Sequence, residues 1–154
     1  MSFRVRGLSP ELFGPLFNLS DAELYRAGAR RVFADDPNLP CRVSMAHAEA
    51  GEELLLVNFE HQPANTPYRS THAIYVRKIA AQTYDKVDEI SPVLATRLLA
   101  VRAFDAEHMM IDADVCEGVR AAEMFERFLS NPAASYLQVH NARRGCYAAR
   151  VERA

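Results

Sequence analysis

The chain has 154 residues, of which 49% are hydrophobic and 25% are charged, and its formal net charge is −2 with a pI near 6.2. This composition is typical of a folded globular protein and not of a disordered one, and the length predicts a single domain over residues 1–154. With a slightly negative net charge, the protein does not attract nucleic acid or an anionic membrane electrostatically, so we expect neither as a partner.

The cysteines indicate which kind of cellular compartment the protein occupies. There are three of them, Cys41, Cys116 and Cys146, and they are scattered along the chain. An odd and scattered set does not form a disulfide framework and is typical of a reducing environment. The first residues lack the apolar core of a signal peptide, and no apolar run approaches the ~20 residues that span a bilayer. We therefore expect a cytoplasmic protein.

The first half of the chain is predicted to be mostly strands. Phe3–Arg6 alternates like a short strand. Ser20 and Glu23 form a capping box, which predicts a two-turn helix that ends at Gly28. Three further strands are expected, at residues 30–34, 53–61 and 72–78. The middle one is apolar on both faces near its start and should be central in a sheet.

The second half is predicted to contain two hairpins and a longer helix. The first hairpin joins residues 97–104 to 109–115, and the second joins 136–140 to 146–153. Between them, Gly118 precedes a helix over 119–129. One face of this helix is expected to be core, formed by Val119, Ala122, Phe125, Phe128 and Leu129. Together these elements predict an α+β fold with a mainly antiparallel sheet of about six or seven strands and two or three short helices.

The loop between the strands 53–61 and 72–78 is rich in hydrogen-bonding side chains. Two prolines limit its backbone freedom, which lowers the entropy cost of holding side chains in place. Arg69 is suited to clamp a carboxylate or phosphate, and Tyr68 offers a ring face and a hydroxyl. His61 and His72 flank the loop and are suited to acid–base chemistry near neutral pH. A solvated loop of ordinary polar residues is the alternative.

The last hairpin predicts a second candidate group. If residues 141–145 form its loop, His140 and Cys146 face each other across the strands with Cβ atoms about 4.5–5.5 Å apart. An imidazole at that distance favours the reactive thiolate. Asn141 and Arg144 lie at the tip and are candidate ligand contacts. The alternative is that Cys146 is a small apolar filler and His140 closes the hairpin.

The sequence does not predict a metal site. His61, His72 and His140 could bind zinc or iron if they converged with Asp112, Asp114 or Cys146. No two of these histidines have a close ligand spacing, and an Asp-x-Asp pair on a strand is a weak signal. His47 and His108 are expected to be solvated. No motif identifies a cofactor, since the G-x-G-x-x-G, P-loop and H-E-x-x-H patterns are absent.

Several strings along the chain resemble a known family. They are Phe3–Leu8, Pro40–Arg42, Asn58–Gln62, Pro67–Ile74, Arg102–Asp105, Asp112–Val115 and His140–Cys146. With these strings the chain resembles, from end to end, a bacterial family of uncharacterised proteins known as domain of unknown function 1203. The resemblance implies a small bacterial stand-alone protein and carries no activity, cofactor or catalytic residue.

Two functional hypotheses follow from the residues. In the first, the loop 62–72 and the tip of the last hairpin meet in one pocket that binds a compact anionic small molecule. The binding candidates are His61, Tyr68, Arg69, Asn141 and Arg144. The candidates for catalysis, if the protein is an enzyme, are His72, His140 and Cys146. In the second hypothesis the chain is a non-catalytic interaction domain, most simply a homodimer.

Overall fold

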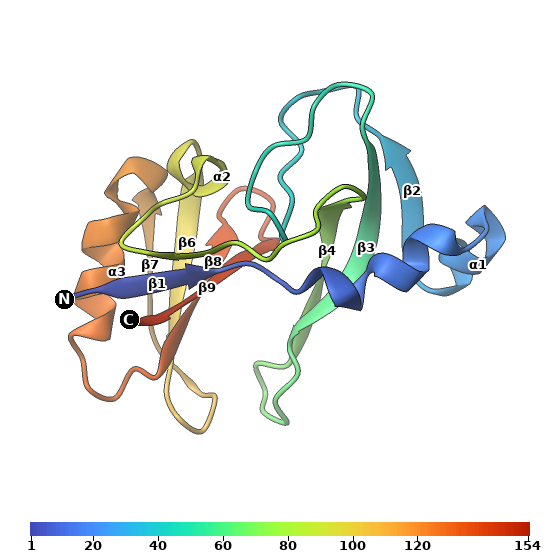
Figure 1. Cartoon of the computed structure of the whole chain (residues 1–154). Coiled ribbons are helices and arrows are strands. Elements are labelled where there is room, and N and C mark those ends of the chain that lie inside the picture. Colours follow the sequence, from blue (N-terminus) through green and yellow to red (C-terminus); the bar gives the residue numbers. More distant parts are fainter.

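The computed structural model describes residues 1–154 and has nine strands in two antiparallel sheets, with three short α-helices (Figure 1). The predicted α+β class is confirmed. The strands are divided between a six-stranded and a three-stranded sheet, where the sequence had indicated one sheet. The two sheets lie next to each other, and the chain termini are both on the side of the larger one (Figure 1).

The six-stranded sheet has the order β5-β1-β9-β8-β6-β7. Its strands are β1 (Phe3–Arg6), β5 (Asp85–Val87), β6 (Leu98–Phe104), β7 (Met110–Glu117), β8 (Tyr136–Asn141) and β9 (Tyr147–Arg153). The three-stranded sheet has the order β2-β3-β4, with β2 (Ala29–Phe33), β3 (Glu53–Gln62) and β4 (Ser70–Arg77). The helices are α1 (Asp21–Arg26), α2 (Pro92–Ala95) and α3 (Ala121–Leu129), and three 3₁₀ turns occur at Pro10–Leu12, Gly14–Asn18 and Gly118–Arg120.

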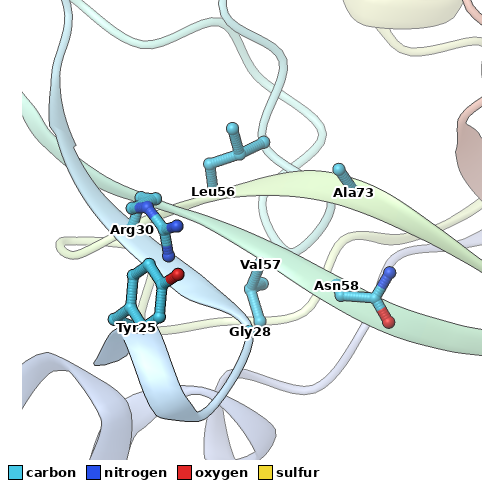
Figure 2. A pocket seen from close by; sticks show the side chains of 7 residues that line it. All are labelled: Tyr25, Gly28, Arg30, Leu56, Val57, Asn58 and Ala73. Carbon is cyan, nitrogen blue, oxygen red and sulfur yellow. The ribbon is translucent and has the colours of Figure 1, made fainter. Parts of the chain in front are cut away.

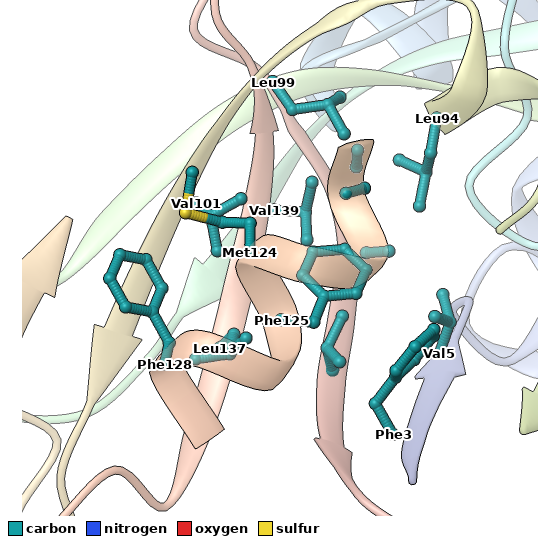
Figure 3. Packing of buried hydrophobic residues seen from close by; sticks show 14 of the residues in the cluster. Phe3, Val5, Leu94, Leu99, Val101, Met124, Phe125, Phe128, Leu137 and Val139 are labelled. Carbon is teal, nitrogen blue, oxygen red and sulfur yellow. The ribbon is translucent and has the colours of Figure 1, made fainter. Parts of the chain in front are cut away.

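The main core lies between α3 and one face of the larger sheet. Figure 3 shows Phe125 of α3 packed among side chains of β1, β6 and β8. Val101 and Val139 are directly paired between β6 and β8 and both point into this core. Because side chains alternate along a strand, the residues between them point to the opposite face of the sheet. Those intervening residues include Arg102, Gln138 and His140, which therefore face the smaller sheet.

The smaller sheet has a separate core. Leu55 and Val57 of β3 lie opposite Val76 and Ile74 of β4, and all four side chains are buried in one cluster. His72 follows on β4 in the same alternation as Ile74, so its ring continues this buried row toward the end of the sheet. A bulge between Glu60 and Gln62 shifts the register at the end of β3. The strand ends that carry His61 and His72 thereby reach the larger sheet.

The structure confirms one prediction for the helices and contradicts another. The capping box at Ser20 is present, with both backbone-to-side-chain hydrogen bonds at 3.2 Å. The predicted core face of the helix 119–129 is wrong at Val119, which is 81% exposed because a 3₁₀ turn at Gly118–Arg120 precedes α3 and rotates it outward. No helix has the length and apolar character needed to cross a bilayer.

Candidate three-histidine centre

His61, His72 and His140 meet where the two sheets face each other. We call these residues the three-histidine centre. His61 is near the end of β3, His72 is near the start of β4, and His140 is on β8 of the larger sheet. The rings of His61 and His72 are stacked with centroids 4.9 Å apart, and the ring of His140 meets that of His61 edge to face, also at 4.9 Å.

One nitrogen from each ring points to a common centre. These three nitrogens all lie within 4.8 Å of one another, and Nε2 of His61 is 2.8 Å from Nδ1 of His72. Zinc–imidazole bonds of about 2.0–2.1 Å would place tetrahedral ligand nitrogens about 3.3 Å apart. The observed separations lie on both sides of this value, so the three ring nitrogens are close enough together to share one metal ion if the rings adjust.

Gln138 fixes the tautomer of His61. Its Nε2 donates to the main-chain carbonyl of His61 at 2.8 Å, and since a carbonyl only accepts, the amide cannot be turned the other way. The amide oxygen therefore faces the His61 ring and accepts from Nδ1–H at 2.8 Å. Nε2 of His61 consequently carries a lone pair, which points toward His72 and Ser70.

The tautomer of His140 follows from the hairpin. Nδ1 of His140 lies 2.9 Å from the carbonyl oxygen of Gly145, so it donates. In the neutral ring Nε2 then holds a lone pair, and its nearest polar partner is the amide oxygen of Gln138 at 3.3 Å, which is also an acceptor. His140 is 0% exposed. It therefore presents a buried lone pair to the centre without a hydrogen-bond donor.

The surroundings favour the neutral form of all three histidines. Burial lowers the pKa of His140 to about 3, with the positive charge of Arg102 and the neighbouring histidines acting in the same direction. Burial and Arg102 also lower the pKa of His61 and of His72. Neutral imidazoles are the form that binds metal ions, so the lowered pKa values reduce the competition of protons for the ring nitrogens.

A cavity of about 250 Å³ opens beside the centre. Its lining includes His61 and Gln138 of the network described above, together with Gln62, Pro63, Ala64, His108, Tyr136 and Arg150. The hydroxyl of Tyr136 accepts from Gln62 at 2.9 Å and is hydrogen-bonded to His108 at 2.7 Å. The Arg150 guanidinium lies 3.9 Å from the centroid of the Tyr136 ring. Of the three histidines, His61 alone lines this polar cavity, so the cavity borders the centre at His61.

A larger hollow of about 480 Å³ lies on the three-stranded sheet (Figure 2). Tyr25 and Arg30 form its rim, with the guanidinium 4.3 Å from the centroid of the ring. Its remaining lining comes from Gly28, Leu56, Val57, Asn58 and Ala73. None of the residues predicted to be functional lies there, and it contains no histidine, cysteine or carboxylate, so the smaller cavity is the better candidate.

The predicted pairing of His140 with Cys146 is wrong. A bulge between Val139 and His140 shifts the register, so His140 lies opposite Tyr147. The sulfur of Cys146 instead contacts Nη2 of Arg42 at 3.1 Å and Nδ2 of Asn141 at 3.4 Å. Asn141 is thus engaged within the hairpin, and Cys146 belongs to a contact with the loop that carries Arg42.

The arginines proposed from the sequence lie outside the centre. Arg69 pairs with Glu60 at 2.9 Å and is exposed, and Arg144 is exposed at the hairpin tip. Tyr68 packs edge to face against Phe104. The loop and the hairpin do approach at one point, because a Cβ on Gly145 would lie 3.9 Å from Nε2 of His72.

The histidines that the sequence could not connect are the ones that converge. Their spacing gave no metal signal because each ligand comes from a different strand, and strand pairing is not visible in spacing. Asp112 and Asp114 are not part of the group, since both are on the exposed edge strand β7. Gln138 and Arg102 lie on the same face of the larger sheet and were not predicted from the sequence as functional residues. The signal was present in β8, where apolar Leu137 and Val139 alternate with Gln138 and His140.

Comparison with known proteins identifies a family and no activity. A family model described as Protein of unknown function (DUF1203) matches residues 38–153, which includes every residue of the three-histidine centre. No curated protein and no solved structure matches the chain.

Proposed function

Since the chain belongs to the family described as Protein of unknown function (DUF1203), whose description assigns no activity, we propose a function from the site itself. The chain binds a divalent transition-metal ion through His61, His72 and His140 and uses this ion to bind a compact anionic small molecule. Zinc and iron are the candidates, because imidazole nitrogen suits both.

The buried lone pair on Nε2 of His140 is the observation that supports this proposal most. A polar atom without a partner in the interior costs about 1–3 kcal/mol, so proteins seldom keep one without a use. Here the lone pair faces a second one on His61 and the nitrogen of His72. A metal cation would satisfy all three atoms at once, with His72 carrying its proton on Nε2 instead of Nδ1.

The surroundings resemble those of metal-binding histidines in general. Such histidines donate their second N–H to a carbonyl or amide oxygen, which orients the ring. His61 donates to Gln138 and His140 donates to Gly145 in this way. Three protein ligands leave a further coordination position, as in catalytic zinc sites, where the ion acts as a Lewis acid and activates a bound water.

The small-molecule part of the proposal depends on size and charge. A cavity of about 250 Å³ lies below the usual range of about 300–1,000 Å³ for ligand pockets, so the ligand must be compact. Three neutral ligands leave the metal's double positive charge uncompensated, which favours an anion at the open position.

A metal titration tests the proposal. The protein is stripped with EDTA, and Zn²⁺ binding is measured by calorimetry and Co²⁺ binding by visible absorption. We expect one ion per chain in the wild type and at least about 100-fold weaker binding in His72→Ala, because a direct ligand contributes more than the 10–100-fold of an outer contact. His72 is partly exposed, so its replacement should leave the fold intact, as circular dichroism would check.

His108→Ala is the matched control. His108 is a histidine at the same cavity, but it contacts Tyr136 and lies outside the centre, so metal affinity should be unchanged. Wild-type affinity no better than that of folded His72→Ala would refute the metal centre.

An interaction domain that forms homodimers is the alternative function. The supporting observation is β7, an edge strand with one side unpaired, with exposed Ile111 and Val115 along it and exposed Met109 just before it. Such edges can pair with a second copy, although Asp112 and Asp114 on the same strand act against this. The mass in solution distinguishes the two cases, since a monomer would refute the alternative.

We further propose a bacterial, cytoplasmic protein without a nucleic-acid or membrane partner. The family resemblance supports a bacterial origin. The three cysteines are free, as in proteins of reducing compartments. The net charge of −2 provides little attraction for polyanions.

A further inference from the structure

We propose that Arg102 makes the three-histidine centre specific for a small carboxylate, with one carboxylate oxygen on the metal ion and the other hydrogen-bonded to the Arg102 guanidinium. This inference rests on the proposed metal centre and names the class of its ligand. It assigns the recognition of the anion to a residue inside the fold, whereas the sequence had suggested Arg69 and Arg144.

Arg102 is placed next to the centre by strand register. It lies on β6 directly opposite Gln138 on β8, and Gln138 is the residue that hydrogen-bonds His61. Its neighbours Val101 and Ala103 point into the core beneath α3, so the Arg102 side chain points to the face where the histidines lie. Its charge acts on all three imidazoles, which agrees with this placement.

Arg102 is the one partly buried arginine that makes no hydrogen bond or ion pair. Nearby Arg150 pairs with Glu152 at 2.5 Å, and buried Arg42 donates to Tyr147, Pro40 and Cys146. No side chain or carbonyl of the protein pairs with the partly desolvated Arg102 guanidinium, and its nitrogens keep some contact with solvent. A partly desolvated guanidinium without a counter-charge is costly, and the cost is recovered when an anion binds.

No acidic side chain of the chain competes for this position. Glu60 pairs with Arg69, and Glu152 pairs with Arg150. The group of metal-ligating side chains contains histidines alone. With the ion bound, the site therefore combines a double positive charge with the guanidinium of Arg102 and attracts an anion from solution.

The shape of the two cations favours a carboxylate. A carboxylate can place one oxygen on the metal ion and the other on the planar guanidinium, so that a single planar group bridges the two cations. The neighbouring cavity of about 250 Å³ leaves room for a short organic acid and excludes a large one. Gln62 and His108 line that cavity and offer polar contacts to the rest of such a molecule.

Acetate binding to the Co²⁺-loaded protein tests the inference. Acetate, inorganic phosphate and chloride are titrated separately, and the Co²⁺ absorption spectrum reports ligands at the open position. We expect acetate to change the spectrum at lower concentration than phosphate or chloride. In Arg102→Gln acetate should bind at least about 10-fold more weakly, since a charge-assisted hydrogen bond contributes about 1.5–3 kcal/mol. Arg102→Lys should lose part of the acetate affinity, because lysine keeps the positive charge but lacks the planar guanidinium.

Arg144→Gln is the matched control and should bind acetate like the wild type, because Arg144 is exposed and outside the centre. Co²⁺ affinity, measured first in each variant, separates the two proposals. If the wild type does not bind Co²⁺, both the metal centre and this inference are overturned. Normal Co²⁺ binding together with equal acetate affinities in wild type and Arg102→Gln overturns the role of Arg102 alone. A preference for phosphate or chloride overturns the assignment to carboxylates.

Discussion

Gln138 connects the two sheets at the level of single atoms. Its amide donates to the main chain of His61 and accepts from the ring of the same residue, while Gln138 itself lies on β8 of the larger sheet. Because this orientation is fixed by a carbonyl, the lone pair on Nε2 of His61 is fixed as well. One buried amide thus determines which nitrogen is available to a metal ion.

The low pKa of His140 makes the metal-free protein sensitive to acid. The unfolded chain binds a proton at His140 near pH 6.5, whereas the folded protein resists this until about pH 3. The unfolded state therefore binds more protons between these values, so stability is full above pH 6.5 and falls as the pH drops toward 3. We expect His140 alone to lower the free energy of unfolding by about 2 kcal/mol between pH 8 and pH 5.

Urea denaturation of the EDTA-treated protein at several pH values measures this loss. In His140→Gln the slope between pH 7 and pH 5 should be smaller by up to about 1.4 kcal/mol per pH unit. Equal slopes in wild type and His140→Gln would contradict the prediction.

Individual residues of the site could be predicted from the sequence, but the contacts between them could not. His61 and His72 were recognised because they flank a proline-bracketed loop, and that arrangement is local. His140 was recognised for its position in a hairpin, but its partner was wrong because one bulge moved the register from Cys146 to Tyr147. Arg102 was missed because its significance comes from pairing with Gln138, which is far away in the chain.

At the scale of elements, the position of α3 depends on close contact between the backbone of Gly118 and the backbone of α2. Gly118 begins the turn that leads into α3, and its N–H donates to the carbonyl of Arg97 at 2.8 Å. A Cβ at this position would lie 1.9 Å from the carbonyl oxygen of Leu94 and 2.8 Å from that of Ala95. These atoms are backbone, so they cannot move aside as a side chain would.

Gly118→Ala should therefore destabilise the protein strongly. We expect a loss of about 3 kcal/mol or more, at the upper end for overpacked positions, because α2 or the start of α3 must shift. Thermal and urea denaturation measure the change. Gly14→Ala is the matched control, since a Cβ there meets no atom within 4 Å, and it should leave stability nearly unchanged. A Gly118→Ala protein as stable as the Gly14→Ala protein would contradict the close contact.

Elements with a local chemical signature were the ones that the sequence predicted well. The capping box at Ser20 placed α1, and the strongly apolar run at residues 53–61 placed β3. Strand β5 (Asp85–Val87) was missed because its three residues are all exposed and carry no alternating pattern. It forms as a strand because β1 offers a free edge beside it, which is a property of the tertiary structure.

At the scale of the whole molecule, the division into two sheets could not be predicted from the sequence pattern. Both sheets consist of antiparallel strands with the same alternation, so nothing local says that residues 29–77 pair only among themselves. The sheets are joined by polar contacts. Arg42, which is 2% exposed, donates to the carbonyl of Tyr147 and to Cys146, and Gln138 bonds to His61.

Metal binding should stabilise the molecule as one unit, because its ligands come from both sheets. His61 and His72 belong to the smaller sheet and His140 to the larger, so separating the sheets would release the ion. A ligand that binds only the folded state adds about 2.7 kcal/mol when it is present at 100 times its Kd. For a chain of this length we expect zinc to raise Tm by about 5–10 °C in a single transition.

Calorimetry with and without Zn²⁺ measures the shift, and EDTA should reverse it. His72→Ala should show a much smaller shift, while His108→Ala should respond like the wild type, since its exposed histidine contacts Tyr136 outside the centre. If zinc raised the midpoint of one transition and left a second one in place, the ion would be bound within a single sheet. That result would contradict a centre shared by β3, β4 and β8, because an ion held by all three strands must stabilise both sheets together.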